Sequence, residues 1–211
     1  MKKFFKKAFV VLGIMGMGLG TASCGAEEII GAIVENGGLT ILQQLLGNIF
    51  NKGGQPNTYQ GTYSLQHLVS DGKDGYTASS EKLTFDNTMC QATLGANNAV
   101  KITLPGTDGI GEAEMTQIDI YNLQFAKAEN GNELTSVVEL SDNSSIDGSL
   151  KIGDKTYAAS NLYLKCNITE SSFVITEASI YFGENEDQVI NVTFNGTIYT
   201  PQEQNNNGQA Q

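Results

Sequence analysis

The chain has 211 residues, a formal net charge of −11, and neither arginine nor tryptophan. An acidic chain without arginine argues against nucleic acid or anionic lipid as a partner held by electrostatic attraction. Glycine, asparagine, serine and threonine are plentiful, which is typical of strands joined by tight turns rather than of a helix bundle. The length suffices for one domain with a substantial hydrophobic core.

The first 23 residues predict a secretory signal peptide. A cluster of four lysines precedes an apolar run over 8–19, which is too short and too rich in glycine for a lasting membrane span. Small residues over 21–23 then lead directly into Cys24. This order resembles the lipobox of bacterial lipoproteins, which implies cleavage before Cys24 and diacylglycerol on its thiol. The alternative is an ordinary signal peptide followed by a chance cysteine.

The residues after Cys24 predict which membrane holds the lipid-anchored protein. Gly25 is not the aspartate that retains many lipoproteins in the inner membrane, and Gly25-Ala26-Glu27-Glu28 resembles the acidic export signal of Bacteroidetes surface lipoproteins. We therefore expect a lipid-anchored protein of the outer membrane, either periplasmic or exposed at the surface.

Residues 24–58 predict an amphipathic helical segment followed by a linker. Apolar residues recur at helical spacing from Ile29 to Phe50, and Gly37-Gly38 should divide them into two short helices. The second helix carries an apolar stripe, formed by Leu42, Leu45, Leu46, Ile49 and Phe50. We expect this stripe to cover an open end or an outer face of the following domain. A membrane surface and a partner protein are the alternatives. The connector over 52–58 should be flexible.

Between residues 59 and 200 the apolar period changes to two, with turn residues between the runs. Short strands without intervening helices predict an antiparallel β-barrel or sandwich. The ten expected strands are Tyr59–Val69, Lys82–Phe85, Met89–Leu94, Ala99–Leu104, Thr116–Lys127, Glu133–Leu140, Ser145–Ile152, Tyr157–Ile168, Ser172–Phe182 and Gln188–Tyr199. The glutamine- and asparagine-rich tail over 201–211 should be disordered.

The fifth expected strand changes its parity halfway. Ile118 and Ile120 share one parity, whereas Leu123 and Phe125 share the other. A β-bulge near residues 121–122 would return both pairs to the core.

Three segments resemble the calycin-like β-barrel domains of Bacteroidetes lipoproteins. They are the first strand, Tyr59-Gln-Gly-Thr-Tyr63, the middle strand, Ile118-Asp-Ile-Tyr-Asn-Leu-Gln-Phe125, and the last strand, Val192-Thr-Phe-Asn-Gly-Thr-Ile-Tyr199. The resemblance implies a mainly β fold, namely a closed, lipocalin-like antiparallel barrel with an N-terminal helical segment, and it implies no particular activity. Gly61-Thr62-Tyr63 stands where eukaryotic lipocalins carry Gly-X-Trp.

Two cysteines follow Cys24. By strand parity, Cys90 and Cys166 both point to the apolar face of their strands. A disulfide between them would close a loop of about 75 residues and add about 4 kcal/mol of stability. The alternative is two buried free thiols that pack as small hydrophobic groups.

No motif in the chain indicates catalysis, a metal site or a cofactor. His67 is the single histidine, and no nucleophile motif accompanies it. Two groups of carboxylates could bind calcium but lack the ligand spacing of a calcium loop: Asp71 with Asp74, and Glu184 with Glu186 and Asp187. Asp108, Glu112 and Glu114 could serve as the paired carboxylates of a glycosidase, but no aromatic platform for a sugar surrounds them. We interpret all three groups as hydrated loop charge. Most of the tyrosines are expected to pack across strands or line the core. The alternative is a tyrosine stripe on the barrel exterior that contacts glycans or partner proteins.

These observations predict a non-enzymatic, lipid-anchored β-barrel of the cell envelope that binds a small apolar ligand or an envelope protein. The alternative is a structural component of the cell surface, such as a fimbrial-type β-sandwich whose edge strand accepts another chain. Strand pairing separates the two, because hydrogen-bonded first and last strands leave no edge for another chain.

Overall fold

The computed structural model describes residues 38–50, 55–73, 75–127, 134–139 and 144–201. The predicted signal peptide, Cys24, the first expected helix and the tail beyond Pro201 lie outside these residues. In the part that is described, no helix combines the length and the apolar character that a membrane crossing needs.

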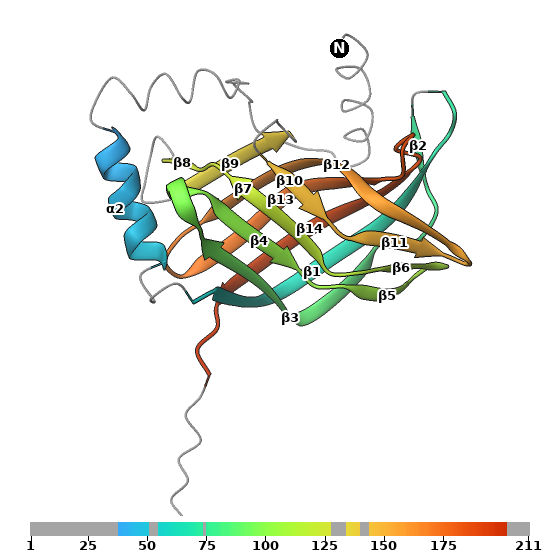
Figure 1. The fold of residues 1–211 in the computed structure, drawn as a ribbon. Coiled ribbons are helices and arrows are strands. Elements are labelled where there is room, and N and C mark those ends of the chain that lie inside the picture. The colour runs from blue at the N-terminus through green and yellow to red at the C-terminus, as the bar shows by residue number, and fades with distance from the viewer. Residues whose placement is uncertain (1–37, 51–54, 74, 128–133, 140–143, 202–211) are drawn as a thin grey trace, which may run out of the picture.

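The described chain is mainly β-sheet with one α-helix (Figure 1). The helix is α2 (Gly38–Phe50), and it begins at the second residue of the glycine pair where a break was predicted. The strands are β1 (Asn57–Ser70), β2 (Tyr76–Ala78), β3 (Leu83–Leu94), β4 (Val100–Leu104), β5 (Thr107–Ile110), β6 (Ala113–Met115), β7 (Ile118–Leu123), β8 (Ala126–Lys127), β9 (Leu134–Glu139), β10 (Ser145–Asp147), β11 (Ser149–Ile152), β12 (Lys155–Ile168), β13 (Ser172–Phe182) and β14 (Gln188–Ile198).

The first and last strands are hydrogen-bonded neighbours. β1 pairs with β14 in antiparallel register from Tyr59 opposite Ile198 to Val69 opposite Gln188. This confirms the pairing expected of a barrel and contradicts an open sandwich with these two strands at opposite edges. The strand order is β10-β7-β4-β3-β1-β14-β13-β12-β11-β6-β5.

β10 and β11 follow one another in the chain but stand far apart in the strand order, so the sheet must curl to bring their positions together. Gly148 alone separates them, and its carbonyl oxygen accepts a hydrogen bond of 2.9 Å from the amide of Ala159 on β12. Gly148 has φ +141°, and an added Cβ would lie 2.8 Å from the carbonyl oxygen of Gln117. Only glycine allows this bend.

The curl is a half-barrel rather than the closed barrel that the resemblance implied. Residues 83–90 of β3 pair with β1 alone among the described strands, and the strand order ends at β5. A β-bulge at Asp86 and Asn87 of β3, opposite Thr62 of β1, locally twists this part of β3, and Asn87 has a positive φ of 56°. Because β4 pairs only with residues 91–94 of β3, the second edge of residues 83–90 is unpaired among the described strands.

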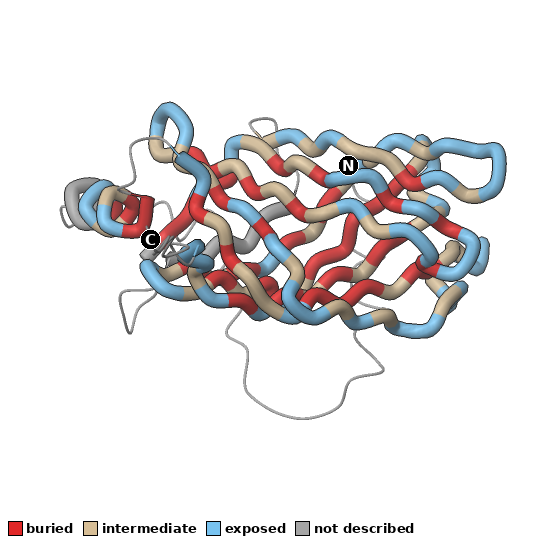
Figure 2. Tube along the Cα trace, turned by 90° about the horizontal axis from the view of Figure 1, so that it is seen from below, coloured by how far each residue is buried: buried red, intermediate tan, exposed pale blue. Residues whose placement is uncertain are grey.

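Buried positions alternate with exposed ones along the strands (Figure 2), and most of the buried apolar side chains form one core cluster. A chain of aromatic contacts runs through it, from Tyr63 to Phe194, then to Phe173 and Tyr59, with ring centroids 5.6–6.5 Å apart. Such edge-on and tilted contacts stabilise a core beyond the area that they bury. The aromatic rings join β1, β13 and β14 into a single unit.

Helix α2 packs against one end of the curled sheet (Figure 1). Leu42, Leu46, Ile49 and Phe50 are buried in the main core, and Leu45 is half-buried against it. The amide Nδ2 of Asn57 donates a hydrogen bond of 2.6 Å to the carbonyl oxygen of Ile49, which ties the last turn of the helix to β1. The predicted packing of the stripe on the β-domain is therefore confirmed.

The predicted bulge in β7 is confirmed. The register between β4 and β7 shifts between Val100 and Ile102, opposite residues 120–123, and Asn122 has φ +59°. Ile118, Ile120, Leu123 and Phe125 are consequently all buried. An asparagine tolerates this left-handed conformation better than most residues.

Several expected boundaries were wrong. The strand expected over Thr116–Lys127 forms β7 and β8, and the one expected over Ser145–Ile152 is divided at Gly148 into β10 and β11. β1 begins at Asn57, inside the segment expected to be a flexible connector. β3 is one strand where two were expected, because Asn87 forms an irregularity inside the strand and does not end it. The glycine-rich stretch expected to be a hydrated loop forms the β5–β6 hairpin, in which Ile110 and Met115 are buried. Asp108, Glu112 and Glu114 on this hairpin are exposed, so the prediction of solvated charge holds for their side chains.

Candidate functional site

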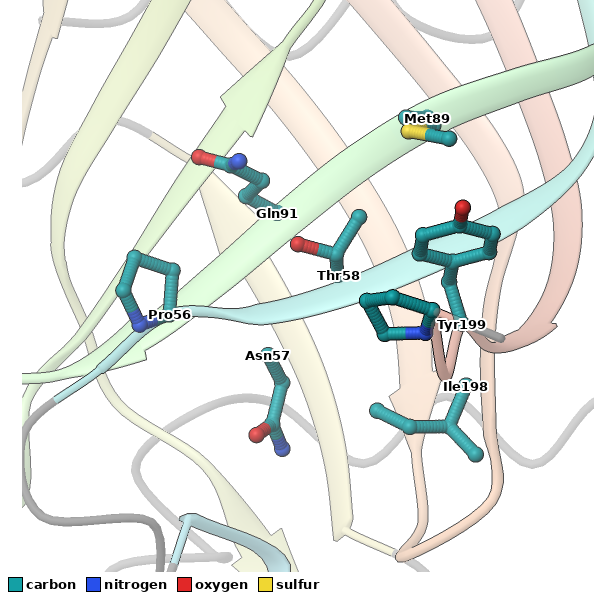
Figure 3. A pocket seen from close by; sticks show the side chains of 8 residues that line it. Pro56, Asn57, Thr58, Met89, Gln91, Ile198 and Tyr199 are labelled. Atoms are coloured by element: carbon teal, nitrogen blue, oxygen red, sulfur yellow. The ribbon is translucent and has the colours of Figure 1, made fainter. Parts of the chain in front are cut away.

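A pocket of about 350 Å³ lies at the outer face of the sheet, where β1 begins and β14 ends (Figure 3). This volume is at the small end of the range for ligand pockets. Two strands next to β1 supply its walls, and β1 itself supplies its floor. The lining residues are Pro56, Asn57, Thr58, Met89, Gln91, Ile198, Tyr199 and Pro201.

Strand alternation places Met89 and Gln91 in the pocket. Their neighbours on β3, Cys90 and Ala92, are fully buried in the core, so Met89 and Gln91 point outward. Met89 is 42% exposed and Tyr199 is 36% exposed, and these are the two large apolar side chains that stand out on the described surface. Figure 3 shows them on the same side of the sheet, on either side of β1.

Backbone hydrogen bonds hold Tyr199 beside the floor of the pocket. Its amide donates to the carbonyl oxygen of Thr58 at 2.7 Å, and the amide of Ile198 donates to that of Ser171 at 2.8 Å. The end of β14 is therefore attached both to β1 and to the turn between β12 and β13. The pocket is built on the sheet and not on a free loop, which favours a fixed geometry.

Asn57 lies under the pocket and points to the opposite side of the strand (Figure 3). It is 2% exposed, and its amide reaches Ile49 of α2 and the hydroxyl of Tyr59 at 3.3 Å. Its Oδ1 atom has no hydrogen-bond partner in the described structure. The same residue therefore lies at the pocket and is hydrogen-bonded to the end of the helix.

The chemistry available to the pocket is hydrogen bonding and stacking. Its lining contains amide, hydroxyl, thioether, proline and phenol groups, and no carboxylate, amine, imidazole or thiol. The side chains of Thr58, Gln91 and Tyr199 form no side-chain hydrogen bond within the described residues, so their polar groups are available to a ligand.

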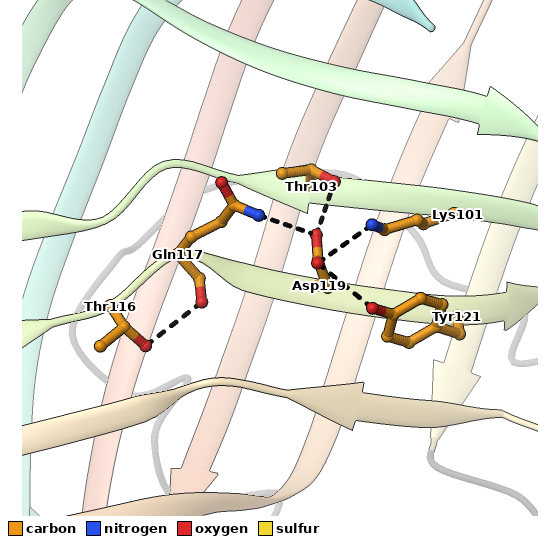
Figure 4. A network of polar contacts seen from close by, with 6 residues as sticks. All are labelled: Lys101, Thr103, Thr116, Gln117, Asp119 and Tyr121. Carbon is orange, nitrogen blue, oxygen red and sulfur yellow. Dashed lines mark hydrogen bonds and ion pairs between the residues drawn. The ribbon is translucent and has the colours of Figure 1, made fainter.

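A second polar cluster lies on the outer face of β4 and β7 (Figure 4). Asp119 accepts hydrogen bonds from Thr103 at 2.7 Å, Gln117 at 3.3 Å and Tyr121 at 3.2 Å, and its Oδ2 lies 3.0 Å from Nζ of Lys101. Partial burial raises the pKa of Asp119, but the hydrogen bonds from Thr103 and Lys101 outweigh this effect and lower it overall.

The Lys101 side of this cluster is also consistent with an ion pair. The hydrogen bond to Asp119 raises the pKa of Lys101, and its ammonium lies 4.9 Å from the centre of the Tyr121 ring. Every oxygen of the carboxylate is occupied by a donor on neighbouring strands. The cluster therefore fastens β4 to β7 and offers no free group to a ligand.

The two cysteines that were candidates for a disulfide are both buried and free. Cys90 lies on β3 and Cys166 on β12, with β1, β14 and β13 between these strands. Parity correctly placed both thiols in the core, but parity does not make their strands neighbours. Burial raises the pKa of both thiols, which keeps them protonated and unreactive.

The histidine and the carboxylates of the turns, which were the other candidates, form contacts that stabilise the fold. His67 is 4% exposed, and its Nε2 lies 2.8 Å from Oε1 of Gln188, which joins β1 to β14. Within the described ranges, no three His, Cys, Asp or Glu side chains are arranged to hold a metal ion. Asp71 closes its own turn by accepting hydrogen bonds from the amides of Lys73 and Gly75, which lower its pKa.

Sequence reasoning did not single out the pocket. Tyr199 was only one of several tyrosines, and Met89 belongs to an ordinary alternating strand. The available signal was that both are apolar residues at outward positions, but their proximity depends on the β3-β1-β14 order. Comparison of the chain with protein-family models, curated proteins and solved structures gives no match.

Proposed function

We propose that this chain is a non-enzymatic binding module of the cell envelope, held at the outer membrane by a lipid on Cys24. The signal-peptide pattern before Cys24 supports the anchor. The outer-face pocket supports binding, since its lining has hydrogen-bonding and stacking groups. The pocket lies on the outer face of a β-domain, and apolar side chains fill the core on the inner face of the sheet.

The pairing of β1 with β14 is the observation that carries this proposal over an assembly role. A fimbrial-type component needs an open edge to accept a strand, and here the first and last strands pair along their whole common length. The unpaired edge of β3 carries the Asn87 irregularity and the exposed Asp86, two features that hinder edge-to-edge pairing.

The anchor is tested by membrane fractionation of cells that produce the chain with Cys24→Ser. We expect loss of fatty-acid labelling and release from the outer-membrane fraction, because the attached lipid supplies the membrane affinity. Ser23→Ala is the matched control, since it preserves a small residue before the cysteine. If the Cys24→Ser protein is processed and stays in the outer membrane, the anchor is wrong.

The binding role is tested by the association state of the chain that starts at Gly25. A module without free first and last edges should stay monomeric in light scattering over a wide concentration range. Detergent-resistant polymers that grow by strand exchange would favour the assembly role instead.

A further inference from the structure

We infer that the pocket at Tyr199 binds a neutral carbohydrate chain, which continues along the outward face of β1 and β14. This inference specifies the ligand of the binding module and therefore rests on the proposed function. We call this outward surface the neutral face. By strand alternation it comprises Gln60, Thr62 and Gln66 of β1 with Asn191, Thr193, Asn195 and Thr197 of β14, while Ser64, at the same parity, is buried against Thr84.

The absence of charge on the two strands is the first argument. β1 and β14 together contain no Asp, Glu, Lys or Arg, although the chain as a whole has a net charge of −11. Their one histidine, His67, is buried. Asp86 of β3 lies at the border and accepts a hydrogen bond of 2.9 Å from Thr62. A charged ligand would find no counter-ion along these strands, so the face favours a neutral one.

The density of hydrogen-bonding groups is the second argument. The register sets Gln60 opposite Thr197, and each following outward pair is likewise polar as far as Gln66 opposite Asn191. Within the described residues, Thr193, Asn195 and Thr197 form no side-chain hydrogen bond. On β1 the outward side chains already bond to residues 80–87 of the same chain, so the open hydroxyl and amide groups are those of Thr193, Asn195 and Thr197 on β14, which stand in a fixed spacing. A ligand rich in hydroxyl groups can satisfy them in succession.

The pocket at the end of this row supplies a stacking surface. The ring of Tyr199 is partly exposed, and the backbone amide of Tyr199 is hydrogen-bonded to Thr58. Gln91 adds a side-chain amide that has no side-chain partner. A sugar ring offers C–H groups on its faces and hydroxyl groups at its rim. An exposed aromatic ring beside amide and hydroxyl groups matches that combination, since a tyrosine provides an apolar body with a polar tip.

The same surface fits a protein partner poorly. Specific protein interfaces have an apolar, aromatic-rich centre surrounded by a polar rim. Here Met89 and Tyr199 are the exposed large apolar side chains of the described surface, and the rest of the neutral face is polar. The carbohydrate therefore remains the better occupant, and a protein partner becomes an outcome that the experiment can show.

The test is affinity gel electrophoresis of the full-length protein in detergent. The gels contain one neutral polysaccharide each, chosen from dextran, starch, barley β-glucan, mannan, xylan, galactan and inulin, with polygalacturonate as the anionic comparison. We expect at least one neutral polysaccharide to retard the protein, and polygalacturonate to have no effect. Tyr199→Ala and Gln91→Ala should each weaken this binding by about tenfold, the scale of losing one anchor at a binding surface.

Three further variants separate stacking, extension and fold. Tyr199→Phe keeps the ring and should bind within about threefold of the unchanged protein, since stacking does not need the hydroxyl group. Asn195→Ala should weaken binding if the carbohydrate continues along the neutral face. Thr156→Ala removes an exposed hydroxyl on β12, away from this face, and should change nothing.

Several results would overturn the inference. They are the absence of retardation in every neutral gel, equal or stronger retardation by polygalacturonate, and retardation that survives Tyr199→Ala. Full binding by Asn195→Ala would overturn the extension along the face. A protein that is anchored through Cys24 and monomeric but binds no carbohydrate refutes this inference alone. Failure of the anchor or of the monomer refutes the proposed function instead.

Discussion

Replacing Leu46 by alanine tests whether α2 is part of the folded domain in solution. Leu46 is 1% exposed and belongs to the main core. Truncating a buried leucine costs about 2–5 kcal/mol, and a helix at the end of a sheet can partly settle into the space, so we expect about 2–3 kcal/mol. For a domain of this size that corresponds to a fall in Tm of about 4–12 °C.

The assay is thermal and urea unfolding of the chain that starts at Gly25, followed by circular dichroism. Gln43→Ala is the matched control, because Gln43 is exposed on the same helix and its replacement should change the free energy of unfolding by less than about 0.5 kcal/mol. Leu45→Ala should fall between the two, since Leu45 is half-buried. If Leu46→Ala leaves both transitions unchanged, α2 is not docked on the sheet, and the argument from burial is refuted.

Three further predictions concern the sheet and its buried groups. Asp119 has a lowered pKa when folded, so its interaction with Lys101 stabilises fully above about pH 4 and is lost as the pH falls through the lowered pKa. Asp119→Asn should cost about 1 kcal/mol at pH 7 in urea unfolding, and progressively less as the pH is lowered below about 4. Cys90 and Cys166 should resist a thiol reagent in the native chain from Gly25 and give two free thiols in denaturant, whereas a mass lower by two hydrogens would show a disulfide. Gly61→Ala should destabilise by about 1–3 kcal/mol or prevent folding, because the new Cβ would press on the backbone of β14, and an unchanged Tm would contradict this close approach.

The sequence by itself determined every feature that depends on local spacing. The period-two alternation from Tyr59 onward was enough for the mainly β fold, and the parity change between Ile120 and Leu123 located the bulge at Asn122. The helical spacing of Leu42, Leu46 and their neighbours was enough for an apolar face that needs a partner. A residue's parity and spacing are properties of its own segment, so they can be read without knowledge of the fold.

The tertiary structure alone decided which segments are neighbours. It separated Cys90 from Cys166 by three strands, although both thiols point inward. It also placed Met89 and Tyr199 on the same face of the sheet, next to the two edges of β1, where they line the pocket. It left the β3 edge open, where Asn87 disturbs a strand that the sequence had divided in two. These outcomes depend on strand order and on the long-range packing of the core, and no local pattern contains that information.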